Sequence, residues 1–228
     1  MGPGAWFGCG ARQPREPAAG AIIVAAGGAG AILVAVAGAR KDLPILSLVS
    51  PLAWEDWLDE HHRTSSGVWL KIPKKRSGVP GPTYAEALEI AICFGWIDGQ
   101  KMAHDELAWL QRFTGRGPRS KWSRINREKA VRLIAEGRMR PAGLEQVDLA
   151  RGDGRWDAAY EPQSTATVPD DLAAELDRSP AAASFYATLD SVNRYAILYR
   201  IGDAKRPETR AKRIRRFVEM LERGEKLH

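Results

Sequence analysis

The side chains best suited to binding an anion lie in one segment, QRFTGRGPRSKWSRIN, which spans residues 111–126. Guanidinium groups form paired hydrogen bonds with carboxylate or phosphate, and Ser120, Ser123 and Asn126 add small hydrogen-bonding groups just before a predicted helix. The amino-terminal end of a helix also attracts anions. Five cations of the segment, and Arg127 directly after it, surround Trp122: Arg112, Arg116, Arg119, Lys121, Arg124 and Arg127. The segment therefore predicts a site for a small anion or an acidic ligand.

Two other interpretations of this segment stay open. Strong basicity beside an aromatic side chain is also typical of surfaces that bind nucleic acid. Alternatively, the segment is a cationic loop whose only task is to pack Trp122 into the hydrophobic core.

The stretch CFGWIDGQ, residues 93–100, offers further candidates. Gly95 is suited to end a helix, and Gly99 permits a bulge in the strand that follows. A hairpin that pairs 96–100 with 107–112 would bring this strand close to the basic segment. We therefore predict one binding groove, lined by Trp96, Asp98, Gln100, Arg112, Arg119, Lys121, Trp122, Ser123 and Asn126.

Cys93, His104 and Asp98 are the residue types of a thiol nucleophile, its base and an orienting carboxylate. However, Cys93 falls in the last turn of an apolar helix, where nothing stabilises a thiolate, and His104 falls on the predicted hairpin turn. Cys93 is interpreted as core filler, so no catalytic residue is predicted and no reaction is indicated.

The histidines of DEHH, residues 59–62, resemble metal ligands in composition only. Consecutive helical side chains diverge by about 100°, whereas ligands on one helix face stand three or four residues apart. We interpret DEHH as the solvated end of a helix and predict neither a metal nor a cofactor.

Charge is concentrated in two parts of the 228-residue chain, whose net charge is +6. Residues 105–140 contain ten Lys or Arg against four Asp or Glu, and residues 205–226 contain nine against four. This distribution indicates an anionic partner or two solvated basic surfaces. The two cysteines, Cys9 and Cys93, do not indicate a disulfide framework.

Residues 1–41 differ from the rest, because Ala and Gly dominate and no charge occurs between Pro17 and Ala39. We interpret them as a disordered or low-complexity extension of a cytoplasmic protein. A signal peptide ending near AVA, residues 35–37, is an alternative. A membrane anchor through residues 18–39 is another. The alternative compartments are the periplasm and the membrane.

From residue 42 onward, the patterns predict an α+β domain followed by an all-helical module. Alternation indicates a strand at 68–72, Thr83 and Glu86 form a capping box, and 96–101 pairs with 107–113. Asn126 is the predicted cap of the next helix. The later helices are expected at 141–150, 169–177, 180–189, 191–203 and 207–223. The domains are predicted as 42–160, with a small antiparallel sheet, and 165–228.

Several of these stretches, taken in this order, resemble the YdeI/OmpD-associated family of bacteriocin-protection proteins. They are TYAEALEIAICFGWIDGQ, LQRFTGRGPRSKWSRIN, RLIAEGRMRPAG, DGRWDAAY and LDSVNRYAILYRIGDAKRPETRAKRI. The resemblance covers about residues 43–228. It implies an amino-terminal domain similar to the YjbR/CyaY-like superfamily, followed by the helical OmpD-associated module.

The same resemblance implies a bacterial stress-tolerance protein that binds a partner rather than an enzyme. Family members are linked to resistance to bacteriocins and cationic antimicrobial peptides, and to association with an outer-membrane porin. The expected partner is an envelope protein of the porin type or a small anion. A cytosolic nucleic-acid binder and an enzyme acting on a small anionic substrate stay open as alternatives. The sequence does not indicate an oligomeric state.

Overall fold

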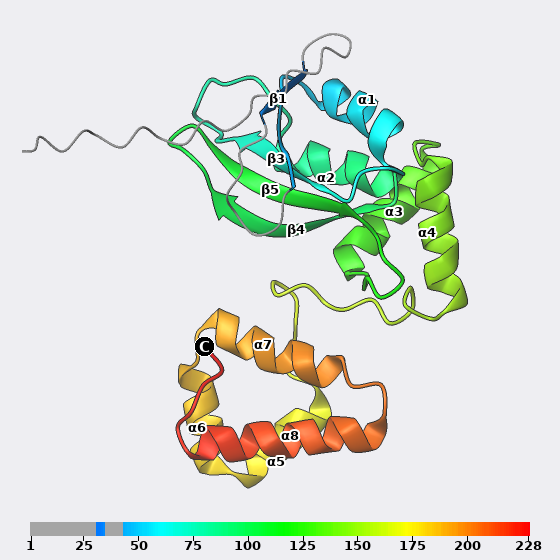
Figure 1. Ribbon diagram of the computed structural model, residues 1–228. Helices are drawn as coiled ribbons and strands as arrows, with labels where there is room; N and C mark the ends of the chain where they lie inside the picture. The colour runs from blue at the N-terminus through cyan, green and yellow to red at the C-terminus, as the bar shows by residue number, and fades with distance from the viewer. Residues whose placement is uncertain (1–30, 35–42) are drawn as a thin grey trace, which may run out of the picture.

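The computed structural model describes residues 31–34 and 43–228 of the chain (Figure 1). A sheet with four helices, running from β1 to α4, forms what we call the sheet module. Four further helices, α5 to α8, form the helical module. Among the described residues, the two clusters of buried hydrophobic side chains have no member in common, so each module has its own core.

The sheet has five strands in the order β1-β2-β3-β5-β4. Their bounds are β1 Ala31–Val34, β2 Ile45–Leu48, β3 Val68–Pro73, β4 Trp96–Ala103 and β5 Ala108–Gly115. The predicted α+β class is confirmed. The sheet is mixed rather than wholly antiparallel, because β2 and β3 pair in parallel. Helix α1 connects these two strands, and a helical crossover returns the chain to the same end of the sheet.

Strand β1 lies inside the segment that we predicted to be an extension. It pairs antiparallel with β2, Ala31 opposite Leu48 and Val34 opposite Ile45. Two of its four residues, Ile32 and Val34, are β-branched, and such residues favour strands. The predictions made for residues 1–30 and 35–42, including the signal-peptide cleavage site and most of the anchor range 18–39, lie outside the described residues.

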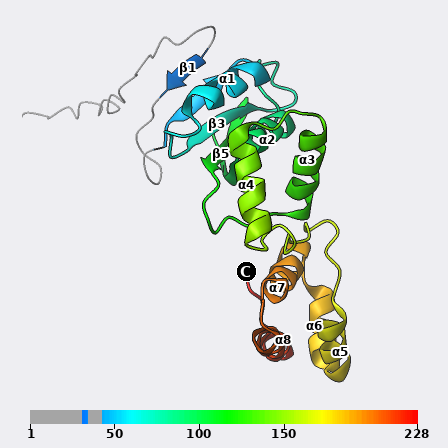
Figure 2. The same ribbon diagram turned by 90° about the vertical axis from the view of Figure 1, so that its right-hand side faces the viewer.

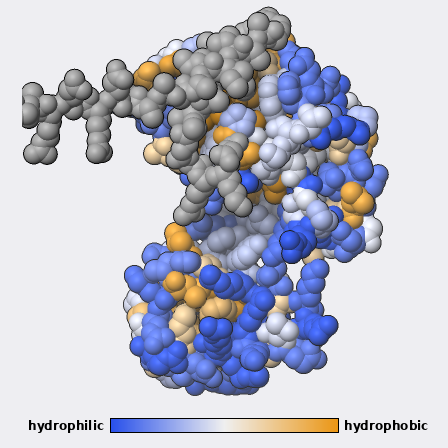
Figure 3. Space-filling model, viewed as in Figure 1, coloured by the Kyte–Doolittle hydropathy of each residue, from blue (hydrophilic) through white to orange (hydrophobic). Residues whose placement is uncertain are grey.

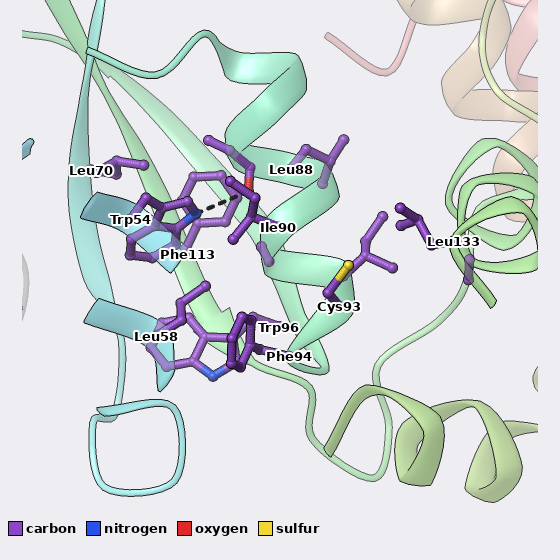
Figure 4. Close-up of a cluster of buried hydrophobic side chains, with 14 of the residues drawn as sticks. Trp54, Leu58, Leu70, Leu88, Ile90, Cys93, Phe94, Trp96, Phe113 and Leu133 are labelled. Carbon is purple, nitrogen blue, oxygen red and sulfur yellow. Dashed lines mark hydrogen bonds between the residues drawn. The ribbon is translucent and has the colours of Figure 1, made fainter. Parts of the chain in front are cut away.

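Helices α1 (Pro51–His61) and α2 (Tyr84–Cys93) cover one face of the sheet (Figure 1). The side chains between them and the sheet form the core of this module (Figure 4). The Trp54 and Phe113 ring centroids lie 5.5 Å apart, and Trp54 Nε1 donates to Ala87 O at 3.1 Å. The buried indole thus keeps a hydrogen-bond partner.

Strands β4 and β5 form the predicted hairpin, and their register shifts between Asp98 and Lys101. The bulge expected near Gly99 is therefore confirmed. Gln111, only 3% exposed, fills the bulge from the opposite strand. Its Nε2 donates to Gly99 O at 2.9 Å and to Gln100 O at 3.3 Å. The carbonyls freed by the bulge are thereby paired.

The end of α2 packs closely against the beginning of α4 (Pro141–Gly152). Gly95 follows α2 with φ +73°, a conformation that glycine adopts without strain. A Cβ on Gly143 would lie only 2.2 Å from Cys93 O, so the two backbones require a glycine there. Arg140 N donates to the same carbonyl at 3.0 Å.

Helix α3 (Arg124–Ala135) begins earlier than the sequence analysis proposed. Its cap is Ser123, whose hydroxyl accepts from Asn126 N at 3.1 Å. The prediction that Asn126 caps this helix was wrong, because the serine three residues earlier satisfies the first-turn amide. Asn126 instead lies buried in the first turn.

The helical module consists of α5 (Asp170–Arg178), α6 (Pro180–Thr188), α7 (Ser191–Gly202) and α8 (Pro207–Glu222). The four predicted helices are confirmed to within one or two residues. In both views, α7 is the helix of this module closest to the sheet module (Figures 1 and 2). Within the described part of the chain, no helix is both long and apolar enough to cross a bilayer.

A candidate anion-binding pocket between the two modules

The two modules enclose a pocket of about 730 Å³. The space-filling view shows the molecule narrowing between its two lobes, where the modules meet (Figure 3). The lining comes from the basic loop after β5, from residues 153–161 after α4, from residues 166–169 before α5, and from α7 to the first turn of α8. It includes five cationic side chains, Arg119, Lys121, Arg155, Lys205 and Arg210, and three acidic ones, Asp153, Glu161 and Asp203.

The basic loop, residues 116–123, is fixed by hydrogen bonds that two arginine side chains donate to its backbone carbonyls. Arg116 Nη1 donates to Lys121 O at 3.1 Å, and Arg155 Nη1 donates to Ser120 O at 2.9 Å. Within the loop, Ser120 Oγ accepts from Gly117 N at 3.0 Å. Because these carbonyls are tied inward, the side chains of Arg119 and Lys121 are exposed and line the pocket.

Three tyrosines form an aromatic wall of the pocket. The ring centroids of Tyr160 and Tyr199 lie 5.2 Å apart edge to face, and those of Tyr195 and Tyr199 lie 6.0 Å apart. Tyr195 OH donates to Glu161 O at 2.9 Å. Burial raises the pKa of Tyr160 and of Tyr195, so these phenols stay protonated at neutral pH. The wall combines flat apolar rings with hydroxyl groups.

Lys121 joins the two modules. Its ammonium group forms an ion pair with Asp203 and donates to Tyr199 OH at 3.3 Å. Burial by itself lowers the pKa of Lys121, but the hydrogen bonds to Asp203 and Tyr199 outweigh it, so the net change is upward. Lys121 is therefore charged at neutral pH, and its charge is largely neutralised by Asp203.

Two more cations of the pocket are already paired. Arg155 Nε donates to Asp153 Oδ2 at 2.7 Å, which lowers the pKa of that carboxyl group. Arg210 holds Asp171 with Nε at 2.5 Å and Nη2 at 2.8 Å. These pairs fix the shape of the pocket walls rather than offering free positive charge.

Arg119 and Lys205 differ from the other three. Neither forms an ion pair or a side-chain hydrogen bond within residues 31–34 and 43–228, and both are exposed. Arg119 belongs to the sheet module, whereas Lys205 follows α7 in the helical module. Lys205 also contributes to the lowered pKa of Asp153, after the larger effect of Arg155. The pocket thus presents unpaired cations from both sides.

The structure brings some predicted site residues to this pocket and leaves others apart. Arg119 and Lys121 line it. Trp122 is the buried side chain of the loop, Ser123 caps α3, and Asn126 is buried in the first turn of that helix. These three side chains anchor the loop rather than line the pocket.

The predicted residues of the hairpin do not line the pocket. Trp96 is 1% exposed and its Nε1 donates to His62 O at 3.1 Å. Asp98 Oδ2 accepts from Tyr84 OH at 2.7 Å. Gln100 is exposed on β4, and Arg112 is half-buried on β5. A binding role for these four residues stays a prediction.

Cys93 has the surroundings of an inert thiol. It is 5% exposed and burial raises its pKa to about 11. His104 lies between β4 and β5, with Nε2 3.6 Å from Asp105 Oδ2. The geometry therefore gives no support to a cysteine nucleophile.

The DEHH stretch lies at the end of α1. Nδ1 of His61 lies 2.9 Å from Trp57 O, and Nδ1 of His62 lies 2.7 Å from Leu58 O. Among the residues that the structure describes, no three His, Cys, Asp or Glu side chains gather as metal ligands would.

The aromatic wall and Lys205 were missed by the sequence reasoning. Tyr195 and Tyr199 stand four residues apart on one helix, so they share a face. That spacing was a usable signal, but nothing local connects it with the basic loop about 80 residues earlier. Only the packing of the modules brings the two together.

Comparison with known protein families gives two matches, and one of them covers the helical module. Residues 165–224 match a family described as "Bacteriocin-protection, YdeI or OmpD-Associated". Residues 46–146 match a family described as "Domain of unknown function (DUF8412)". No curated protein and no solved structure matches the chain.

The fold is therefore that of a two-module α+β protein with a pocket between its modules. Residues 165–224 are thus similar to the YdeI/OmpD-associated family, as the sequence predicted for that part of the chain, whereas the match does not extend to the rest of the predicted range of 43–228.

Proposed function

We propose that this protein acts by binding a small anionic ligand in the pocket between its modules. The observation that carries the proposal is the pair of unpaired cations, Arg119 and Lys205, on the two sides of that pocket. A ligand held between them would touch both modules at once. Its negative charge would pair with Arg119 and Lys205, which form no ion pair with a carboxylate of the described chain.

The tyrosine wall favours a ligand that also has a flat apolar part. Tyr160, Tyr195 and Tyr199, together with Leu198, offer rings and aliphatic surface beside the cations. Pockets of this volume suit drug-sized molecules, in which a few polar groups fix the orientation of a mostly apolar body. The proposed ligand class is an aromatic or otherwise planar anion.

The family that residues 165–224 match is described by the words bacteriocin protection, and we extend the proposal to a role of that kind. Because the pocket has more cationic than acidic side chains, it does not suit direct capture of a cationic peptide. We propose instead that a small anion or an acidic group of an envelope partner occupies it, and that the protein contributes to stress tolerance through this binding.

The test uses 8-anilinonaphthalene-1-sulfonate, a planar aromatic sulfonate, titrated against the full chain and followed by fluorescence and calorimetry. We expect saturable binding with one site per chain. The variant carrying Arg119→Ala and Lys205→Ala should bind at least roughly tenfold more weakly, since each charge-assisted contact is worth about 1.5–3 kcal/mol. Equal affinity in the two proteins, or binding that does not saturate, contradicts the proposal.

Arg76→Ala is the matched control, because Arg76 is an exposed arginine of the sheet module that does not line the pocket. It should bind the sulfonate like the unmodified chain. A single-stranded oligonucleotide is the competing ligand. If it displaces the sulfonate with an affinity that falls steeply with salt, a nucleic-acid surface replaces the small-anion pocket.

A further inference from the structure

Arg116 is a charged side chain buried where β5 ends and the basic loop begins. It is 7% exposed, although arginine is rarely buried without a partner. Its guanidinium carbon lies 3.6 Å from the centroid of the Trp122 ring. The backbone amide of Arg116 donates to Gly95 O at 3.0 Å. These contacts fix both the position of the residue and the packing of its guanidinium group.

Only part of this guanidinium group is paired by the surrounding chain. Nη1 donates to Lys121 O at 3.1 Å. Nε and Nη2 are buried and have no hydrogen-bond partner within residues 31–34 and 43–228. Their N–H bonds run parallel along one edge of the guanidinium plane, which is the arrangement that pairs with two oxygens of one carboxylate. The free donors are therefore a matched pair.

A third donor lies beside them. Nε1 of Trp122, on the ring that the guanidinium group covers, is also buried without a partner in the described part of the chain. A buried donor without an acceptor destabilises the folded state, and a charged donor does so more strongly. Three such donors on two neighbouring side chains indicate that this position requires an acceptor.

Asp98 does not supply that acceptor. Its charge acts on Arg116, but its Oδ2 accepts from Tyr84 OH at 2.7 Å. Within the described residues, no hydrogen bond or ion pair connects Asp98 with the guanidinium group. Burial lowers the pKa of Arg116 to about 10, and the charge of Asp98 opposes that shift. Arg116 thus stays charged at neutral pH.

We propose that the Nε–Nη2 edge of Arg116, with Trp122 Nε1 beside it, is a buried subsite for a carboxylate group. Arg116 does not line the pocket described above, but it lies directly behind Lys121, whose carbonyl it holds. The subsite and the pocket are therefore separate sites, and the subsite does not depend on the proposed function.

The test measures the thermal unfolding midpoint of the full chain as sodium acetate replaces sodium chloride at constant ionic strength. A ligand that binds the folded state raises the midpoint in a saturable way. We expect a rise of about 3 °C when acetate reaches ten times its dissociation constant. A midpoint that does not respond to acetate overturns the proposal, and Arg116 is then a structural side chain.

Arg116→Met keeps much of the side-chain volume and removes all donors. Replacing a buried charge by an apolar side chain of similar size is often tolerated, so this variant should fold and lose the acetate response. Arg76→Ala, an exposed arginine of the sheet module that lines neither site, is the matched control and should keep the response. An acetate response that persists in Arg116→Met contradicts the subsite.

Two further measurements keep the proposal testable if Arg116→Met fails to fold. Arg116→Lys keeps the positive charge but lacks the two parallel N–H donors, so it should lose most of the acetate response. In the unmodified chain labelled with 15N-arginine, the Nε–H resonance that Arg116→Lys removes should shift on adding acetate. If phosphate moves this resonance and acetate does not, the carboxylate class is wrong.

Discussion

The hairpin β4–β5 and the basic loop that follows it carry similar side chains but differ in how their polar groups are paired. On the hairpin, Trp96 Nε1 is bonded to His62 O, Asp98 is bonded to Tyr84, and Gln111 fills the bulge, whereas Arg112 Nε is buried without a partner in the described chain. In the loop, within the described residues, Arg119 has no ion-pair partner, and Nε and Nη2 of Arg116 have no hydrogen-bond partner.

This difference separates structural from functional candidates better than residue type does. Polar groups that the chain pairs with itself hold the fold, whereas exposed cations without partners are available to a ligand. Substitutions on the hairpin should therefore affect stability. Substitutions of Arg119 should affect binding.

The largest effect is expected from Trp96→Ala. The indole is 1% exposed and its ring centroid lies 6.3 Å from that of Trp54. Removing it leaves a large cavity, so the free energy of unfolding should fall by about 3–5 kcal/mol. Urea unfolding followed by circular dichroism measures this change. A loss below about 1 kcal/mol would show that the hairpin is not the supporting element that its packing indicates.

A smaller loss is expected from Gln111→Ala. This change removes the buried side-chain amide that donates to Gly99 O and Gln100 O, so both hydrogen bonds across the bulge are lost. The free energy of unfolding should fall by about 1–3 kcal/mol. Amide hydrogen exchange should become faster around residues 98–101, while the helical module keeps its protection. If the exchange of this bulge is unchanged, Gln111 is not what holds it.

The smallest effect on stability is expected from Arg119→Ala. The side chain is exposed and unpaired within residues 31–34 and 43–228, so the free energy of unfolding should change by less than about 0.5 kcal/mol. The same urea titration measures it. The sulfonate affinity should nevertheless fall. A large loss of stability would place Arg119 with the hairpin residues and remove the contrast between the two regions.

Much of the local structure was predictable because its signals act over a few residues. Thr83 and Glu86 form the expected capping box, with Thr83 N donating to Glu86 Oε2 at 2.8 Å and Glu86 N donating to Thr83 Oγ1 at 3.3 Å. Prolines mark the first turn of α1, α4, α6 and α8, as expected. The hairpin and its bulge followed from alternation and one glycine.

The predictions that failed or stopped short depended on contacts between distant segments. The pairing of β2 with β3 in parallel depends on how α1 crosses the sheet. The start of α3 depended on a choice between two polar residues three positions apart, Ser123 and Asn126, both of which are suitable caps. Local patterns could not decide either question.

The sequence by itself determined the two-part organisation, the helices and the hairpin, the basic character of the loop, and the resemblance that the helical module confirms. The tertiary structure decided which cations are free. Lys121 meets Asp203 and Tyr199 across the two modules, and Arg116 is buried against Trp122 with one edge unpaired. The physical reason is that hydrogen bonding and ion pairing depend on distances of a few ångströms between residues far apart in the chain, and packing alone sets those distances.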